Sequence, residues 1–160
     1  MKAISVTLTV NGELHTIMVE PNKTLLYVLR DDLGLTGVKD ACGGEGECGA
    51  CTIIMNGEAI NACLVLAGQA AGSRIETIEG LARNGELHPL QRAFVELGAV
   101  QCGFCIPGAV MSAKALLDHH PQPSDEAIRE ALSGNLCRCT GYTKMIAAVR
   151  RAAEEMNYAR

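Results

Sequence analysis

Eight cysteines in two groups are the residues of this sequence best able to do chemistry. The first group has the spacing C-x5-C-x2-C-x11-C and consists of Cys42, Cys48, Cys51 and Cys63. The second has the spacing C-x2-C-x31-C-x-C and consists of Cys102, Cys105, Cys137 and Cys139. Four cysteines at such spacing could bind zinc, bind an iron–sulfur cluster or pair as disulfides.

Glycines surround the first group. The stretch ACGGEGECGAC, residues 41–51, contains Gly43, Gly44, Gly46 and Gly49. Glycine lets the backbone approach a bound group closely and adopts the positive φ angles that aim N–H groups inward. The stretch also matches G-x-G-x-x-G, but a dinucleotide loop joins a strand directly to a helix, whereas a strand is predicted to follow here.

Iron–sulfur clusters explain these features better than zinc or disulfides. Structural zinc sites usually take C-x2–4-C pairs at both ends, which the pair Cys137-x-Cys139 fits poorly. A zinc site also has little use for a long glycine loop, whereas the sulfides of a cluster accept backbone N–H hydrogen bonds. Clustered thiols in a reducing compartment more often bind metal than form disulfides. We therefore favour iron–sulfur clusters and keep zinc and disulfides as alternatives.

The first half of the chain is predicted to position the first group on a small mixed sheet with one helix. Residues 4–10 alternate apolar and polar side chains, Asn11-Gly12 predicts a hairpin turn, and residues 14–19 return. Residues 24–34 favour a short helix, and a second hairpin is predicted about Asn56-Gly57. In that hairpin opposite residues sum to 113, so Cys51 faces Ala62 and Cys63 returns beside Cys51.

The second half is predicted to be helical. Pro89 and Pro107 open two helices, Ser124 caps a third, and residues 142–156 form a fourth. We expect Arg150–Glu154 and Arg151–Glu155 pairs on the outer face of the last helix. Each pair of the second cysteine group precedes a helix, whose N-terminal N–H groups would stabilise thiolates. The α+β chain is thus predicted to divide into domains at 1–78 and 79–160.

Composition excludes several functions. The net charge is −4 with acids and bases mixed, so no basic stripe indicates nucleic acid. The longest apolar stretch is too interrupted to span a bilayer, and the start is no signal peptide, which predicts a cytoplasmic protein without membrane insertion. No activated serine, phosphate loop or H-E-x-x-H motif is present, so no substrate chemistry is expected on this chain.

The motifs GECGACT, QCGFCIPG and GNLCRCTGY together resemble the iron–sulfur subunit of the molybdenum hydroxylases, the xanthine dehydrogenase family. The resemblance covers nearly the whole chain. It implies a ferredoxin-like β-grasp domain followed by an all-α four-helix-bundle domain, each with one [2Fe–2S] cluster. It also implies an electron-transfer subunit of an oxidoreductase, with a large molybdopterin-binding partner and a medium FAD-binding partner in a heterotrimer or its dimer.

The resemblance assigns the site residues. It implies that the first cysteine group ligates the outer cluster, nearer the flavin, and the second ligates the inner cluster, nearer the molybdenum cofactor. Gln101 takes the position of a glutamine that contacts the pterin of that cofactor. A free-standing two-cluster ferredoxin and a zinc-binding structural adaptor are the alternative functions.

The first group departs from the family pattern, which usually has four residues between its first two cysteines. Here five residues separate Cys42 from Cys48. We expect the extra residue to bulge outward at Gly43-Gly44, so that Cys42 still reaches iron. Ile106 replaces the usual threonine of the C-T-P-G motif, and only a local packing difference is expected there.

Overall fold

The structure of the protein is a computed structural model that describes residues 2–158. Residues 1, 159 and 160, at the ends of the two predicted domains, lie outside the described residues. The strands are β1 (Ile4–Val10), β2 (Glu13–Val19), β3 (Thr52–Met55), β4 (Glu58–Asn61) and β5 (Arg74–Glu76). The helices are α1 (Leu25–Tyr27), α2 (Pro89–Glu96), α3 (Ile106–His119), α4 (Asp125–Leu132) and α5 (Thr143–Tyr158).

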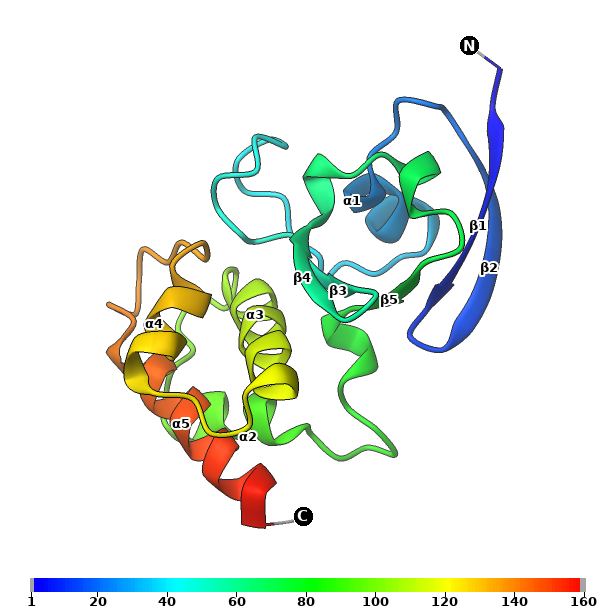
Figure 1. The fold of residues 1–160 in the computed structure, drawn as a ribbon. Coiled ribbons are helices and arrows are strands. Elements are labelled where there is room, and N and C mark those ends of the chain that lie inside the picture. Colours follow the sequence, from blue (N-terminus) through cyan, green and yellow to red (C-terminus); the bar gives the residue numbers. More distant parts are fainter. Residues whose placement is uncertain (1, 159–160) are drawn as a thin grey trace.

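The five strands form one mixed sheet in the order β2-β1-β5-β3-β4, and α1 lies beside it (Figure 1). Strand β1 pairs with β5 in parallel, and the other neighbours are antiparallel. Both predicted hairpins are present, and Asn11, Gly12, Asn56 and Gly57 all adopt positive φ, which two-residue hairpin turns require. The register pairs Thr52 with Asn61, in agreement with the predicted sum of 113.

The predicted helix at residues 24–34 is shorter and more irregular than a regular α-helix. After α1 the chain widens, and the N–H of Leu33 donates to the carbonyl of Val28 across five residues. Its apolar side chains Leu25, Leu26 and Leu29 are fully buried. This segment therefore closes one side of the sheet.

Helices α2 to α5 form the second half of the fold (Figure 1). The cap prediction for α4 is confirmed, because the Ser124 hydroxyl accepts the Ala127 N–H at 3.2 Å. The expected pairs within α5 are wrong: Arg150 binds Asp125 of α4, and Glu155 binds Arg92 of α2. No helix in residues 2–158 combines the length and hydropathy that crossing a bilayer requires.

Two groups of buried side chains meet at strand β3. One lies between the sheet and α1, and the other lies among α2 to α5. Ile53 belongs to the buried side chains between the sheet and α1, and its neighbour Ile54 to those among the helices. Successive side chains of a strand point to opposite faces, which explains the difference. Helix α3 packs on β3, so the helices are held directly against the sheet.

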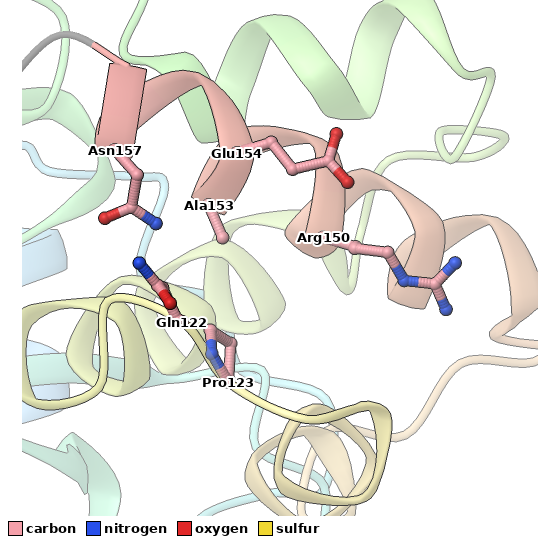
Figure 2. A pocket seen from close by; sticks show the side chains of 6 residues that line it. All are labelled: Gln122, Pro123, Arg150, Ala153, Glu154 and Asn157. Atoms are coloured by element: carbon pink, nitrogen blue, oxygen red, sulfur yellow. The ribbon is translucent and has the colours of Figure 1, made fainter.

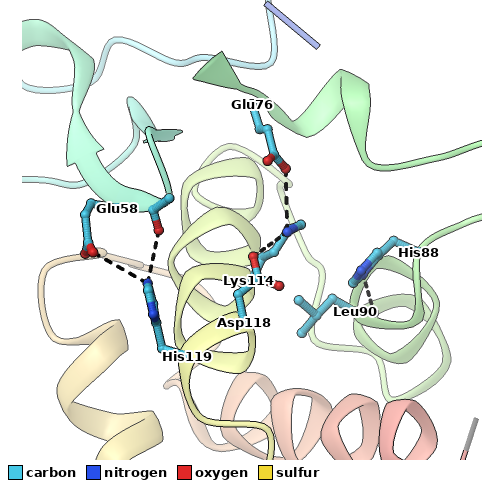
Figure 3. Close-up of polar contacts among 8 residues, drawn as sticks. Glu58, Glu76, His88, Leu90, Lys114, Asp118 and His119 are labelled. Carbon is cyan, nitrogen blue, oxygen red and sulfur yellow. Dashed lines mark hydrogen bonds and ion pairs between the residues drawn. The ribbon is translucent and has the colours of Figure 1, made fainter. Parts of the chain in front are cut away.

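Side chains of α3 also bind the sheet and its turns (Figure 3). Lys114 pairs with Glu76 of β5 at 3.5 Å as well as with Asp118 of its own helix. The imidazole of His119 lies 3.6 Å from Glu58 and 3.2 Å from the carbonyl of Gly57. His119 thus bridges the two halves of the chain.

Acid is expected to destabilise the start of α2 through His88, whose imidazole accepts the Leu90 N–H at 3.2 Å (Figure 3). Burial, reinforced by the charge of Lys114, lowers the pKa of His88 below its usual value. The unfolded state therefore takes up the proton more readily, and stability is lost as the pH falls below about 6.5. Thermal unfolding between about pH 5 and 8 should show this loss.

The non-titrating variant His88→Asn, which keeps a capping acceptor, is the matched control. It should show a shallower loss of stability in this pH range. Identical pH dependence in the two proteins would contradict the assignment to His88.

Candidate metal centres

The two cysteine groups of the sequence are called the first and second cysteine sets from here on. The β3–β4 hairpin brings the last two cysteines of the first set together. Cys51 precedes β3, and Cys63 lies in the short turn that follows β4. The N–H of Ala62 donates to the carbonyl of Cys51 at 3.3 Å, which continues the ladder by one residue as the register predicted. The Cys51 and Cys63 side chains are in hydrogen-bonding contact, and both residues are buried.

The glycine loop brings the other two sulfurs over this pair. The Cys42 thiol contacts Cys48 and accepts backbone N–H groups from the loop, and the charge of Cys48 also acts on Cys51. All four loop glycines have positive φ, between 67° and 89°. A Cβ at Gly43 or Gly44 would meet nothing within 4 Å, so open space is available at these positions for the bulge that the longer spacing predicts.

Asp40 holds the start of this bulge, although no sequence motif marked it. One carboxylate oxygen accepts the Gly43 N–H at 2.9 Å, and the other accepts the Tyr27 hydroxyl at 3.0 Å. The loop is fixed at its far side too, where the Asn61 amide donates to the carbonyl of Gly46 at 2.9 Å. These hydrogen bonds give this part of the loop a defined conformation.

The first set contains thiols of opposite character. The backbone N–H of Glu47, with a hydrogen bond from the Cys48 side chain, lowers the pKa of Cys42 to about 7. Burial raises the pKa of the Cys51 thiol to about 12. A buried thiolate is costly without a cation nearby, so binding of a metal would have to accompany its deprotonation.

The second set lies at the starts of α3 and α5. The Sγ atoms of Cys102 and Cys139 are 3.6 Å apart, and Cys105 is in hydrogen-bonding contact with Cys137. Burial raises the pKa of Cys105 to about 12. Burial acts in the same sense on Cys137, but hydrogen bonds from the hydroxyl and N–H of Thr140 lower its pKa to about 7.

The two sets differ in exposure. Cys102 and Cys139 are exposed to solvent, whereas Cys51 and Cys63 are buried. Gln101 is also exposed, and its amide donates to the carbonyl of Cys139 at 3.0 Å. The exposed apolar side chains of Val100, Phe104 and Leu136 are close neighbours in sequence of these cysteines.

Each set fits a two-iron cluster by its donors and its cradle. Within residues 2–158, the His, Cys, Asp and Glu side chains form no group of three or more that is arranged around a metal ion. The thiols contact one another in pairs, and a two-iron cluster distributes its protein ligands over two metal atoms. Positive φ at the loop glycines turns N–H groups toward Cys42, the kind of contact that tunes cluster sulfur.

The two cysteine loops touch each other, which the sequence did not reveal. The N–H of Leu136 donates to the carbonyl of Cys48 at 2.9 Å. In Figure 1 the loop around residues 40–50, drawn in cyan, lies beside the orange segment that leads into α5. The two sets are therefore connected through the backbone.

A pocket of about 440 Å³ opens between α5 and the α3–α4 connection (Figure 2). Gln122 and Pro123 line one side, and Arg150, Glu154 and Asn157 come from α5. Arg150 is already engaged by Asp125, and the lining contains no cysteine. The pocket is therefore separate in composition from both cysteine sets.

Two family profiles match the chain. The 2Fe-2S iron-sulfur cluster binding domain matches residues 8–80, and the [2Fe-2S] binding domain matches residues 77–150. Together they cover both cysteine sets.

Characterised proteins and solved structures agree with these matches. The chain is 57% identical over 154 residues to the nicotinate dehydrogenase small FeS subunit of Eubacterium barkeri, covering 96% of this chain and 98% of that protein. It is 49% identical to the nicotine 6-hydroxylase small subunit of Paenarthrobacter nicotinovorans, covering 91% and 87%. The crystal structure of quinoline 2-oxidoreductase from Pseudomonas putida 86 has a TM-score of 0.94 at 42% identity, with 99% and 98% coverage.

Proposed function

The chain belongs to the [2Fe–2S] iron–sulfur subunits of the molybdenum hydroxylase family, and on that premise we propose how it relays electrons. Electrons leave a molybdopterin cofactor on a large subunit, cross the second and then the first cysteine set, and reach FAD on a medium subunit. Two sets of four cysteines joined by backbone contact support this route most directly. When bound, each cluster accepts and releases electrons, while this chain orients and insulates it.

The eight cysteines are the proposed ligands. Cys42, Cys48, Cys51 and Cys63 would hold the outer cluster, with the backbone of the four loop glycines around it. Cys102, Cys105, Cys137 and Cys139 would hold the inner cluster. The side-chain contacts within each set support this division, which follows the proposed domains at 1–78 and 79–160, a β-grasp domain and a four-helix bundle.

The large subunit would cover the second cysteine set. Cys102 and Cys139 are exposed to solvent in the isolated chain. An inner cluster held by them would therefore be poorly shielded from water. Phe104 and Leu136 are 46% and 57% exposed beside them, the kind of apolar surface that marks a protein interface. A partner docked there would place its pterin beside Gln101, whose amide is already oriented by Cys139.

The complex would be a heterotrimer or its dimer in the cytoplasm. The substrate would bind on the large subunit, and the medium subunit would lie on the side of the first cysteine set.

Metal content and partners test this function. We expect iron and acid-labile sulfide in equal amounts and two distinct two-iron EPR signals after reduction. A colourless zinc protein would refute it, and a chain that never associates with flavin- and molybdenum-bearing subunits would instead be a free ferredoxin.

A charge at Phe104 tests the docking face. Phe104→Glu should leave both EPR signals but abolish co-purification with the molybdenum-bearing subunit. The control is Leu14→Glu, at a side chain that is 73% exposed on the edge strand β2. Equal recovery of the complex with both variants would contradict docking over Phe104.

A further inference from the structure

Asn135 is a buried polar residue that contacts both cysteine loops. Only 4% of its surface is exposed, and it lies two residues before Cys137. Its amide donates to the carbonyl of Gly49 at 2.9 Å and to the hydroxyl of Thr52 at 3.3 Å. A buried amide is costly unless its hydrogen bonds are made, and these two partners lie in the other half of the chain.

The backbone around this contact is packed without spare room. A Cβ at Gly49 would overlap the carbonyl oxygen of Gly134, and one at Gly108 of α3 would overlap the carbonyl oxygen of Gly49. The Thr52 hydroxyl also donates to the Gly49 carbonyl at 2.7 Å, so this single oxygen is held from both halves. The separation of the two loops is therefore fixed by direct contact.

The contact between the two cysteine loops is called the junction below. It also contains a short path of covalent and hydrogen bonds between the cysteine sets. The backbone carbonyl of Cys48 accepts the N–H of Leu136 at 2.9 Å, and Leu136 is covalently joined to Cys137. Asn135 is the residue immediately before Leu136, and Gly49 immediately follows Cys48. The Asn135–Gly49 hydrogen bond therefore runs beside the Leu136–Cys48 hydrogen bond and holds the same two segments.

We infer that Asn135 is a positioning residue. It sets the distance between the two clusters and maintains the hydrogen bond between the loops that hold them. This inference rests on the proposed function and adds the element that couples its two centres. An electron that crosses the junction would oxidise the cluster held by one set and reduce the cluster held by the other by one equivalent, and no atom or proton is transferred. Without the Asn135 amide, the Leu136–Cys48 contact loosens, the clusters couple more weakly, and electron exchange between them slows.

The test is EPR of the fully reduced complex, because two paramagnetic clusters held close together split each other's lines. Asn135→Ala should keep the iron and sulfide content but lose this splitting. It should also slow electron redistribution between the clusters after rapid partial reduction. Thr52→Val, which removes the second partner of the amide, should reduce the splitting in the same direction.

Asn61→Ala is the matched control. Asn61 also donates an amide hydrogen bond to a carbonyl of the glycine loop, that of Gly46, but it lies in the same half of the chain as the loop. This variant should alter the outer-cluster signal and preserve the splitting. If Asn135 had a purely structural role, Asn135→Ala would lower stability, and the outer-cluster signal and the splitting would change together rather than independently.

Three results would overturn the inference. The first is unchanged splitting in Asn135→Ala and Thr52→Val, or its absence from the unsubstituted complex. The second is equal loss of splitting in Asn61→Ala. The third is loss of iron by both junction variants, because Asn135 would then be needed for assembly rather than spacing. An unsubstituted chain without two two-iron signals would instead defeat the proposed function.

Discussion

Cys42→Ala is expected to lose the outer cluster and with it half of the iron. Cys42 is the first cysteine of a set that a 2Fe-2S profile covers, and its thiol already contacts Cys48 and the loop N–H groups. Without this thiolate, one iron would lack a protein ligand, and a cluster with an incomplete ligand set would not persist. Iron and sulfide analysis with EPR should show that one two-iron signal disappears and that the signal of the second set remains.

Deletion of Gly44 is the matched control for Cys42→Ala. It shortens the loop to the spacing usual in the family and removes a residue whose Cβ position faces open space. The outer cluster should survive this deletion. Full iron content in Cys42→Ala would contradict ligation by Cys42, and loss of the cluster on deletion would contradict an outward bulge.

Gly49→Ala is expected to destabilise the protein by about 3 to 4 kcal/mol, which lowers the melting temperature by roughly 10 °C. Two costs combine at this position. Its φ of +67° disfavours any side chain, and the added Cβ would overlap the carbonyl of Gly134 and the side chain of Asn135. Thermal unfolding of the cluster-loaded chain, followed by circular dichroism, measures the change.

Gly44→Ala separates these two costs. Gly44 has a φ of +89° and lies in the same loop, but a Cβ there would meet nothing within 4 Å. Only the backbone cost of about 1 to 2 kcal/mol is then expected. Equal melting temperatures for the two variants would show that the contact between the loops contributes nothing.

Sequence patterns predicted the local structure that presents the first cysteine set. The Asn56-Gly57 turn determined the register of its hairpin, and the register returned Cys63 to Cys51. Such turns can be read from sequence because positive φ at two adjacent residues strongly favours asparagine and glycine. The other hairpin, about Asn11-Gly12, was predictable for the same reason.

Sequence patterns did not predict contacts in which neighbouring residues enter different cores or a side chain binds a partner on another helix. The apolar pair Ile53-Ile54 indicated a strand, but not that each side chain enters a different core. The spacing of Arg150 and Glu154 favoured an ion pair within α5, yet Asp125 of the neighbouring helix provides the partner. A side chain on a helix surface can choose among partners whose positions depend on packing.

The chemistry of this protein was already present in its residue order: eight thiols in two sets, a glycine loop that admits positive φ, and the turns and helix starts that present them. How the two sets meet became visible in the folded chain, through Asn135 and Gly49, which lie 86 residues apart. Motif spacing records which residues can bind a metal, because ligands and turns are local. The contact between two loops depends on how the sheet and α3 pack, and no local pattern encodes that distance.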